Sequence, residues 1–384
     1  MEAYLDNSAT TRTFDEVAKL MVKIMIEDYG NPSAMHLKGV EAEEYIKKSA
    51  ERISKVLKVD PKEILFTSGG TESNNLAIIG AALANERSGK HIITTSVEHA
   101  SVRSTMDFLE ERGFRITYLP VNSKGVVDVK DLETSICDDT ILCSIMYVNN
   151  EMGSVMPVKE IGEIIREKKP DIIYHVDAIQ AFGKYEIHPR RQKIDMLSVS
   201  SHKIHGPKGA GFLYIKDKTK IKPIIYGGGQ QRGMRSGTEN VPGIAGMGLA
   251  TEMIYNNLSE KIDRLYELKD YMIDRLSKIE DVRINSGKGR DVAPQIVNAS
   301  FIGVRSEVLR HALETKNIYV SAGSACNSNK HVSSNTLKQM GLKPEEIESA
   351  IRFSFNLQTS KEEVDYAVDT IKEMLPKLRI FVRK

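Results

Sequence analysis

Alternating strand and helix signals between residues 64 and 176 constrain the fold more than any other feature of the sequence. The expected strands are 64–66, 92–96, 114–119, 140–148 and 171–176. The expected helices are 73–85, 102–112, 132–136 and 158–168. Strands that are joined through helices run parallel and need helices over both faces of their sheet. The sequence therefore predicts an α/β fold whose large domain has a mostly parallel sheet between helices.

The stretch 194–215 adds two expected strands and brings the predicted sheet to seven. An apolar segment, 194–199, is followed by Ser200-Ser201-His202-Lys203, a turn at Gly206-Pro207 and a second apolar segment, 212–215. A lysine at the end of a buried strand is partly desolvated, which lowers its pKa and frees its amine for imine chemistry. A solvated surface lysine is the common alternative, and this stretch alone leaves both interpretations open.

The length of 384 residues exceeds that of a usual single core, so two domains are expected. Residues 241–279 are predicted to be largely helical, and their densely charged second half is a plausible connector. Later strand signals at 282–284, 297–301 and 318–320 stand among helices, as in a smaller α+β domain. We assign 14–257 to the large domain, and 1–13 with 258–384 to the small one.

Composition excludes several classes of protein. Lys+Arg number 54 against Asp+Glu 52, a net charge of +2 that does not favour a nucleic-acid or membrane surface. No apolar run is long enough to span a bilayer, and the N-terminal residues lack the pattern of a signal peptide. The three cysteines do not form a disulfide framework. A soluble, cytoplasmic protein is expected.

Polar groups follow nearly every expected strand. They are Thr67-Ser68-Gly69-Gly70-Thr71, His99, Asn149, Asp177 with Gln180, and Ser200 with His202 and Lys203. Ligands of open parallel sheets bind beyond the carboxyl ends of the strands. The sequence therefore predicts a ligand site at this edge.

Two of these groups indicate which chemical groups the ligand has. The 68–73 segment joins a strand to a helix, and its backbone N–H groups suit a phosphate, although Thr71 or Ser73 could simply cap the helix. Asp177 ends an apolar strand and needs a cationic partner, which a protonated pyridine nitrogen would provide. An N-cap role for Asp177, or its pairing with His175, is equally open.

The histidines and one arginine leave alternatives as well. His99 could be a structural histidine at a strand end. His202 and His205 lie three residues apart without a third ligand, so no metal site is predicted. Arg352 is a lone cation in an apolar stretch, where it could bind a substrate carboxylate or form a structural salt bridge.

Cys326 is the cysteine with a predicted chemical role. It lies in a run of small and polar residues, 321–330, which is typical of a mobile surface loop, so its thiol is expected to be exposed and reactive. Cys137 and Cys143 flank an apolar strand and are expected in or near the core.

Together, these motifs resemble a known family over nearly the whole chain. They are 4–11 (YLDNSATT), 30–33 (GNPS), 67–75 (TSGGTESNN), 98–99 (EH), 149–153 (NNEMG), 175–180 (HVDAIQ), 200–206 (SSHKIHG), 235–240 (RSGTEN), 324–326 (SAC) and 351–354 (IRFS). The chain resembles the NifS/IscS-like cysteine desulfurases, which are pyridoxal-phosphate enzymes of fold type I. The segment SAGSAC is similar to the long-loop class, which supplies iron–sulfur cluster assembly.

This resemblance implies a role for each matching residue. Lys203 would form the Schiff base, Asp177 would pair with the pyridine nitrogen, and His99 would stack on the ring and assist proton transfer. The remaining cofactor contacts implied are Asn149, Gln180 to the phenolic oxygen, and Gly70, Thr71, Ser200 and His202 to the phosphate. Arg352, helped by Asn149, would bind the substrate carboxylate.

The resemblance also implies the reaction and its partners. L-Cysteine would lose its sulfur to Cys326 as a persulfide and leave L-alanine, and an iron–sulfur scaffold or other acceptor would take the sulfur for clusters and thio-cofactors. Thr238 would reach the phosphate of a neighbouring subunit in a homodimer, with no need for nucleic acid, membrane or metal. Gln230-Gln231 and 355–358 depart from the family pattern. Selenocysteine lyase, aminotransferase and a scaffold without turnover are the alternatives.

Overall fold

The computed structural model describes residues 1–322 and 334–380. A seven-stranded sheet has the order β2-β8-β7-β6-β5-β3-β4. Its strands are β2 (Ile64–Thr67), β3 (His91–Thr95), β4 (Arg115–Leu119), β5 (Thr140–Met146), β6 (Ile173–Asp177), β7 (Met196–Ser200) and β8 (Gly211–Ile215). Six of these strands run in the same direction, and β8 alone runs opposite to them, between β2 and β7. The predicted mostly parallel sheet is confirmed.

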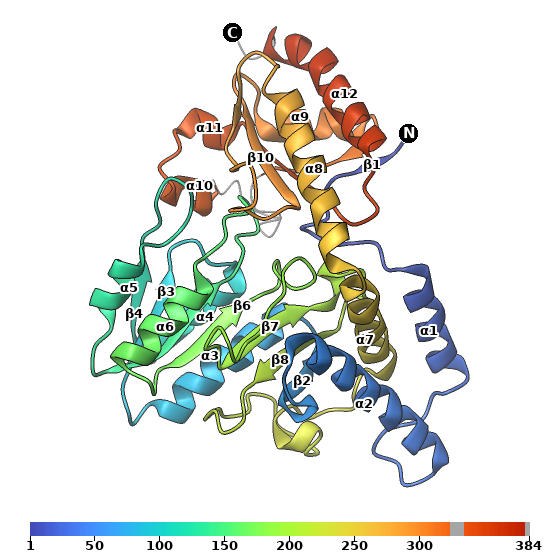
Figure 1. Cartoon of the computed structure of the whole chain (residues 1–384), viewed down its shortest axis with the longest axis vertical. Coiled ribbons are helices and arrows are strands. Elements are labelled where there is room, and N and C mark those ends of the chain that lie inside the picture. Colours follow the sequence, from blue (N-terminus) through green and yellow to red (C-terminus); the bar gives the residue numbers. More distant parts are fainter. Residues whose placement is uncertain (323–333, 381–384) are drawn as a thin grey trace.

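Helices cover both faces of this sheet (Figure 1). They are α1 (Asp15–Ile26), α2 (Leu37–Leu57), α3 (Gly70–Asn85), α4 (Ala100–Glu110), α5 (Val129–Ser135), α6 (Val158–Lys168) and α7 (Val241–Tyr255). Within β5, Leu142 packs with apolar residues of α3 and α4, whereas Cys143 and Ile145 belong to the core on the other face. Burial on both faces explains why these strands are continuously apolar rather than alternating.

A second, smaller sheet lies at the other end of the molecule (Figure 1). Its strand order is β12-β13-β10-β9, all antiparallel, and β1 pairs with β11 in a separate parallel ladder. The strands are β1 (Ala3–Tyr4), β9 (Val282–Ile284), β10 (Ile296–Phe301), β11 (Ile318–Tyr319), β12 (Ser321–Ala322) and β13 (Ala350–Ser354). The accompanying helices are α8 (Leu258–Leu276), α9 (Ser306–Glu314), α10 (Asn335–Gln339), α11 (Pro344–Glu348) and α12 (Lys361–Ile380). The pairing of β1 with β11 places the first residues of the chain beside its last third.

Two sequence predictions were wrong in detail. The helix expected over 241–279 is interrupted, because Asn257 adopts a left-handed conformation (φ 55°) between α7 and α8, which asparagine tolerates better than most residues. Cys137 is exposed rather than buried, because it lies in the turn before β5 and only Cys143 lies within the strand. In the part of the chain that the structure describes, no helix is both long and apolar enough to cross a membrane.

Candidate active site

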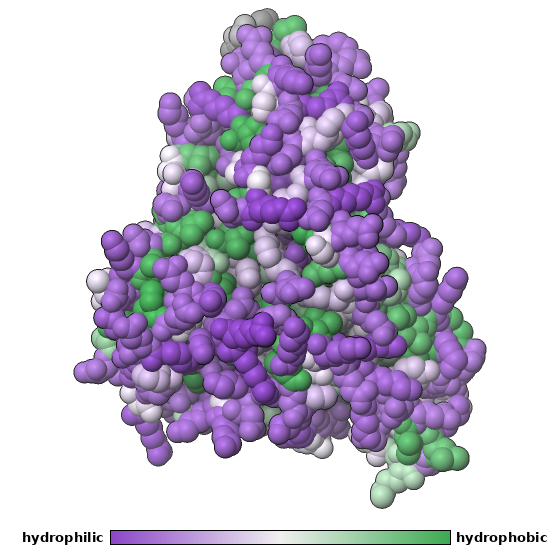
Figure 2. Space-filling model, viewed as in Figure 1, coloured by the Kyte–Doolittle hydropathy of each residue, from purple (hydrophilic) through white to green (hydrophobic). Residues whose placement is uncertain are grey.

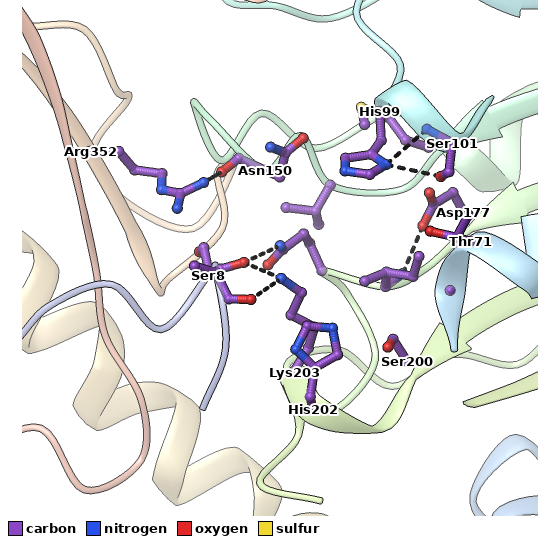
Figure 3. Close-up of a pocket in the computed structure, with 16 residues that line it drawn as sticks. Ser8, Thr71, His99, Ser101, Asn150, Asp177, Ser200, His202, Lys203 and Arg352 are labelled. Carbon is purple, nitrogen blue, oxygen red and sulfur yellow. Dashed lines mark hydrogen bonds between the residues drawn. The ribbon is translucent and has the colours of Figure 1, made fainter. Parts of the chain in front are cut away.

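A cavity of about 320 Å³ opens at the carboxyl ends of the large sheet's parallel strands, which is the size of an ordinary small-molecule site. The residues that line it are Ser8, Ala9, Gly70, Thr71, His99, Ser101, Met146, Val148, Asn150, Asp177, Ile179, Gln180, Ser200, His202, Lys203 and Arg352. Figure 3 shows Lys203 between Arg352 on one side and Asp177 on the other. Most of the residues predicted from strand ends therefore meet in one place.

Lys203 ends a single 3-10 turn, Ser201–Lys203, that directly follows β7. Its Nζ donates hydrogen bonds to the carbonyl oxygens of Ser8 and Ala9, the latter at 2.7 Å. The amide of Gln180 also donates to the Ser8 carbonyl, at 3.0 Å. The N-terminal segment thus holds the lysine amine at the wall of the cavity.

Asp177 is the last residue of β6 and is buried. One carboxylate oxygen accepts from the Ile179 backbone N–H (3.0 Å), and the other accepts from the Asn74 amide (2.8 Å). Burial raises the pKa of Asp177, although these bonds and the nearby His99 and Lys203 oppose the rise. The His175 ring is bonded to Ser144 and Ser198 instead, so the predicted alternative pairing with His175 is wrong.

The first turn of α3 suits an anion. The helix begins at Gly70, and its N-cap, Gly69, has a φ of 149° and provides no side-chain cap. The alternative cap at Ser73 is wrong, because the Ser73 hydroxyl donates to the Phe212 carbonyl inside the protein. A Cβ atom on Gly70 would lie 2.2 Å from Ile179 Cδ1, so a larger residue fits there only if the Ile179 side chain moves aside. Helix N-termini with uncapped N–H groups bind phosphates.

His99 is the N-cap of α4. Its Nδ1 accepts a hydrogen bond from the Ser101 backbone N–H at 3.1 Å. Because Nδ1 is the acceptor, the neutral ring carries its proton on Nε2. This bond therefore fixes both the orientation and the tautomer of a ring that lines the cavity.

Arg352 lies within β13 and is only 2% exposed. Its guanidinium donates to the Asp6 carboxylate (2.7 Å), the Asn150 carbonyl (2.9 Å) and the Ser321 hydroxyl (3.0 Å). Among the described residues, its Nε has no hydrogen-bond partner. The structural salt bridge that the sequence left open is therefore present, yet Arg352 also lines the cavity and retains donor capacity for an anion.

Two of the predicted residues are not gathered at this cavity. The Asn149 side-chain oxygen accepts from the backbone N–H groups of Glu151 and Met152, both at 2.9 Å, and Asn150 lines the wall in its place. Thr238 is exposed and does not line the cavity. Cys326 lies outside the described residues.

Sequence reasoning missed two groups of residues that complete the site. One is the pair Ser8 and Ala9, which belong to the motif 4–11 but were assigned no role. The other is Asn74 and Ser101, which hold Asp177 and His99 in place. The only signal in the sequence was that Asn74 lies within the motif 67–75 and that Ser101 closely follows the motif 98–99.

These donors and acceptors fit pyridoxal phosphate. The Lys203 amine matches the aldehyde of this cofactor. Asp177 is a buried carboxylate without a bonded cation among the described residues, and it matches the ring nitrogen. The uncapped N-terminus of α3 matches the phosphate. Gly70 also provides the close approach that a phosphate requires at the helix end.

The buried carboxyl group of Glu98, directly before His99, predicts how the stability of the fold depends on pH. It is buried; one oxygen accepts from Thr95 Oγ1 (2.7 Å) and the Met146 N–H (2.9 Å), whereas the other has no partner among the described residues. Burial raises its pKa from 4.5 to about 8. The folded state thus keeps a proton that the unfolded state loses, so the free energy of unfolding falls as pH rises from 4.5 to about 8.

We expect Glu98→Gln to remove this loss of stability. Urea unfolding at about pH 4 and about pH 9, on either side of this window, measures it. The wild-type chain should lose more unfolding free energy between the two pH values than the variant does. Equal losses in both proteins would show that Glu98 is already ionised at neutral pH.

Comparison with known proteins agrees with this geometry. Residues 3–367 match the family model for class-V aminotransferases. Cysteine desulfurase IscS of Clostridium botulinum (strain Hall) is 41% identical over 380 residues, covering 98% of this chain and 95% of that protein. Cysteine desulfurase IscS of Klebsiella pneumoniae is 44% identical over 381 residues, covering 98% and 93%.

Solved structures give the same result. A NifS-like protein, 38% identical, superposes with a TM-score of 0.93 and covers 98% of this chain and 100% of its own. A structure described as SspA in complex with cysteine is 35% identical, with a TM-score of 0.82, and covers 92% of this chain and 98% of its own. The chain belongs to the class-V aminotransferase family. Enzymes of this family and its cysteine desulfurases use pyridoxal phosphate, so the predicted fold type and cofactor are confirmed.

Proposed function

We propose that this chain is a cysteine desulfurase that removes sulfur from L-cysteine and leaves L-alanine. The observation that carries this proposal is the single cavity in which Lys203, Asp177 and Arg352 meet, in a chain similar to cysteine desulfurases over 98% of its length. Bound pyridoxal phosphate supplies an electron sink for the carbon next to the substrate's amino group. The protein positions the substrate and moves its protons.

The proposed roles at the cofactor end follow from the bonds described above. The Asp177 carboxylate, oriented by Asn74 and the Ile179 N–H, holds a proton on the ring nitrogen. Lys203 Nζ would hold the aldehyde carbon of the cofactor, and the same amine would take the proton from the substrate's α-carbon. His99 presents its Nε2 proton to the cavity. The other proposed cofactor contacts are Gly70, Thr71, Gln180, Ser200 and His202.

The substrate carboxylate is assigned to Arg352. Its guanidinium is held by Asp6 and by the Asn150 carbonyl, so its direction is fixed before substrate arrives. Asn149 acts on this end only through the backbone, since its side-chain oxygen orients the N–H groups of the next two residues. Arg352 thus places the α-carbon of the substrate near Lys203.

Cys326 is proposed to take the sulfur. The Ser321 hydroxyl, five residues before Cys326, accepts a hydrogen bond from Arg352, so this segment starts beside the proposed carboxylate site. The Cys326 thiolate forms an S–S bond to the substrate sulfur while the carbon–sulfur bond breaks. The electron pair of that bond stays on carbon, which takes up a proton on the way to alanine.

Cys326→Ala is the test of this role. We expect the variant to keep its bound cofactor and yellow colour but to stop forming alanine from L-cysteine when no reductant is added. Alanine and sulfide are measured together, with Cys137→Ala as the control because Cys137 is an exposed thiol at the far end of β5. Sustained turnover by Cys326→Ala would refute the nucleophile role.

A second copy of this chain is the proposed partner. Thr238 is exposed and away from its own cavity, so its proposed phosphate contact requires a neighbouring subunit. Large apolar side chains are also exposed at the end of α1, at the start of α2 and in the segment that joins them, where Figure 2 shows a hydrophobic area at the lower right. They are Met25, Ile26, Tyr29, Met35, Leu37 and Val40. Sedimentation at the mass of a single 42.9 kDa chain would contradict the dimer.

We also propose that the sulfur passes to an iron–sulfur scaffold or another acceptor, and that the protein is cytoplasmic. Both statements rest on similarity to the IscS proteins. The alternative of transamination has no use for a thiol at position 326, so amino-group transfer to a keto acid by Cys326→Ala at the wild-type rate would favour it.

A further inference from the structure

Lys184 lies in the turn after β6 and contacts the lysine proposed to carry the cofactor. Its Nζ donates a hydrogen bond of 2.7 Å to the backbone carbonyl of Lys203. Both side chains also line a second, smaller cavity of about 10 Å³, which is near the smallest volume that holds a water molecule. Gln295 lines it too, with a side-chain oxygen that has no partner among the described residues.

The small cavity beside Lys184 offers it no opposite charge. Among the described residues, the other titratable side chains that line this cavity are those of Lys203 and His205, and none is a carboxylate. Burial lowers the pKa of His205 to about 4, and its Nδ1 lies 2.9 Å from the Arg12 carbonyl, so this ring is neutral at neutral pH. The surrounding parts of α7 and α8 and residues 355–357 contribute only uncharged side chains.

Two lysine amines in one poorly solvated region repel each other when both are protonated. Burial, together with the charge of Lys203, lowers the pKa of Lys184 to about 7. Lys184 therefore begins to release its proton at neutral pH, where an isolated lysine would retain it. Protonated or neutral, its amine can donate to the Lys203 carbonyl.

We propose that Lys184 is a positioning residue for Lys203, which fixes the turn beneath it by donating a hydrogen bond to the Lys203 carbonyl. This inference rests on the proposed role of Lys203. The bond holds the Ser201–Lys203 turn, and thereby the position from which the Lys203 amine enters the main cavity. No step of the reaction requires Lys184 to contact substrate.

The test measures adduct formation rather than turnover. The full-length chain, freed of cofactor, is mixed with pyridoxal 5'-phosphate across a pH series, the product is reduced with borohydride, and the modified lysine is located by mass spectrometry. Lys184→Met removes both the hydrogen bond and the charge, and Lys184→Gln removes the charge but keeps a donor. Lys269→Met is the matched control, because Lys269 is a buried lysine that likewise donates to a backbone carbonyl (Ala293, 2.7 Å).

We expect Lys184→Met to slow the labelling of Lys203 several-fold across the pH series, because the Ser201–Lys203 turn loses the hydrogen bond that holds it. Lys184→Gln should label faster than Lys184→Met at every pH, because its amide can still donate to the Lys203 carbonyl. Lys269→Met should leave the labelling rate of Lys203 in place even if the chain is less stable. Labelling of Lys203 in Lys184→Met at the wild-type rate would overturn the inference, whereas labelling that is absent from Lys203 altogether would overturn the proposed function.

Discussion

Lys203→Ala is expected to abolish covalent cofactor binding and to lower alanine formation by at least about 10²–10⁴-fold, the usual contribution of a positioned acid–base group. The amine is the only lysine nitrogen lining the main cavity among the described residues. The carbonyls of Ser8 and Ala9 hold it there, so no other lysine can replace it without moving the N-terminal segment. The visible absorption spectrum and alanine release from L-cysteine give the two readouts.

Lys208→Ala is the matched control for that experiment. Lys208 is exposed and lies five residues along the same segment, so its removal changes the local charge equally without touching the cavity. It should retain colour and turnover. A coloured, borohydride-reducible adduct in Lys203→Ala would assign the covalent bond to another lysine and would remove the basis of the proposed mechanism.

Asp177→Asn is expected to have the next largest effect. The amide keeps an oxygen for the Ile179 N–H but removes the charge, so a protonated ring nitrogen would face a buried dipole instead of a carboxylate. Breaking a buried charge pair in this way costs about 3–5 kcal/mol, which corresponds to a loss in kcat/KM of about 10²–10³-fold or more. Steady-state kinetics and the affinity for pyridoxal phosphate measure it.

Glu98→Gln provides the comparison for this second prediction. Glu98 is also a buried carboxyl group, and its electrostatic interaction with Asp177 makes it sensitive to the same charge. Because its pKa is about 8, it is mostly protonated at neutral pH, and the amide is a close substitute. Near-normal kcat/KM in Glu98→Gln beside a large loss in Asp177→Asn would separate a charge requirement from simple disturbance of the core. Equal losses in the two variants would contradict the assigned role of Asp177.

The strands and the chemistry at their ends were predictable from local sequence. Continuous apolar segments such as the one around Cys143 indicate strands buried on both faces, and the connecting helices require parallel neighbours. Since the carboxyl ends of parallel strands lie at one edge, the order of the residues alone assigns Asp177 and Lys203 to one site. Cys137 shows the limit of this reasoning, because a residue one turn outside a strand has no periodicity to place it.

Tertiary structure alone decided how these residues are held. Lys203 meets the Ser8 carbonyl across 195 residues of sequence, and Arg352 meets Asp6 across 346. The bond from Lys184 to the Lys203 carbonyl likewise joins two separate turns. Local sequence determines strand and helix preferences because these depend on neighbouring residues, whereas hydrogen bonds between distant segments depend on how the whole chain packs.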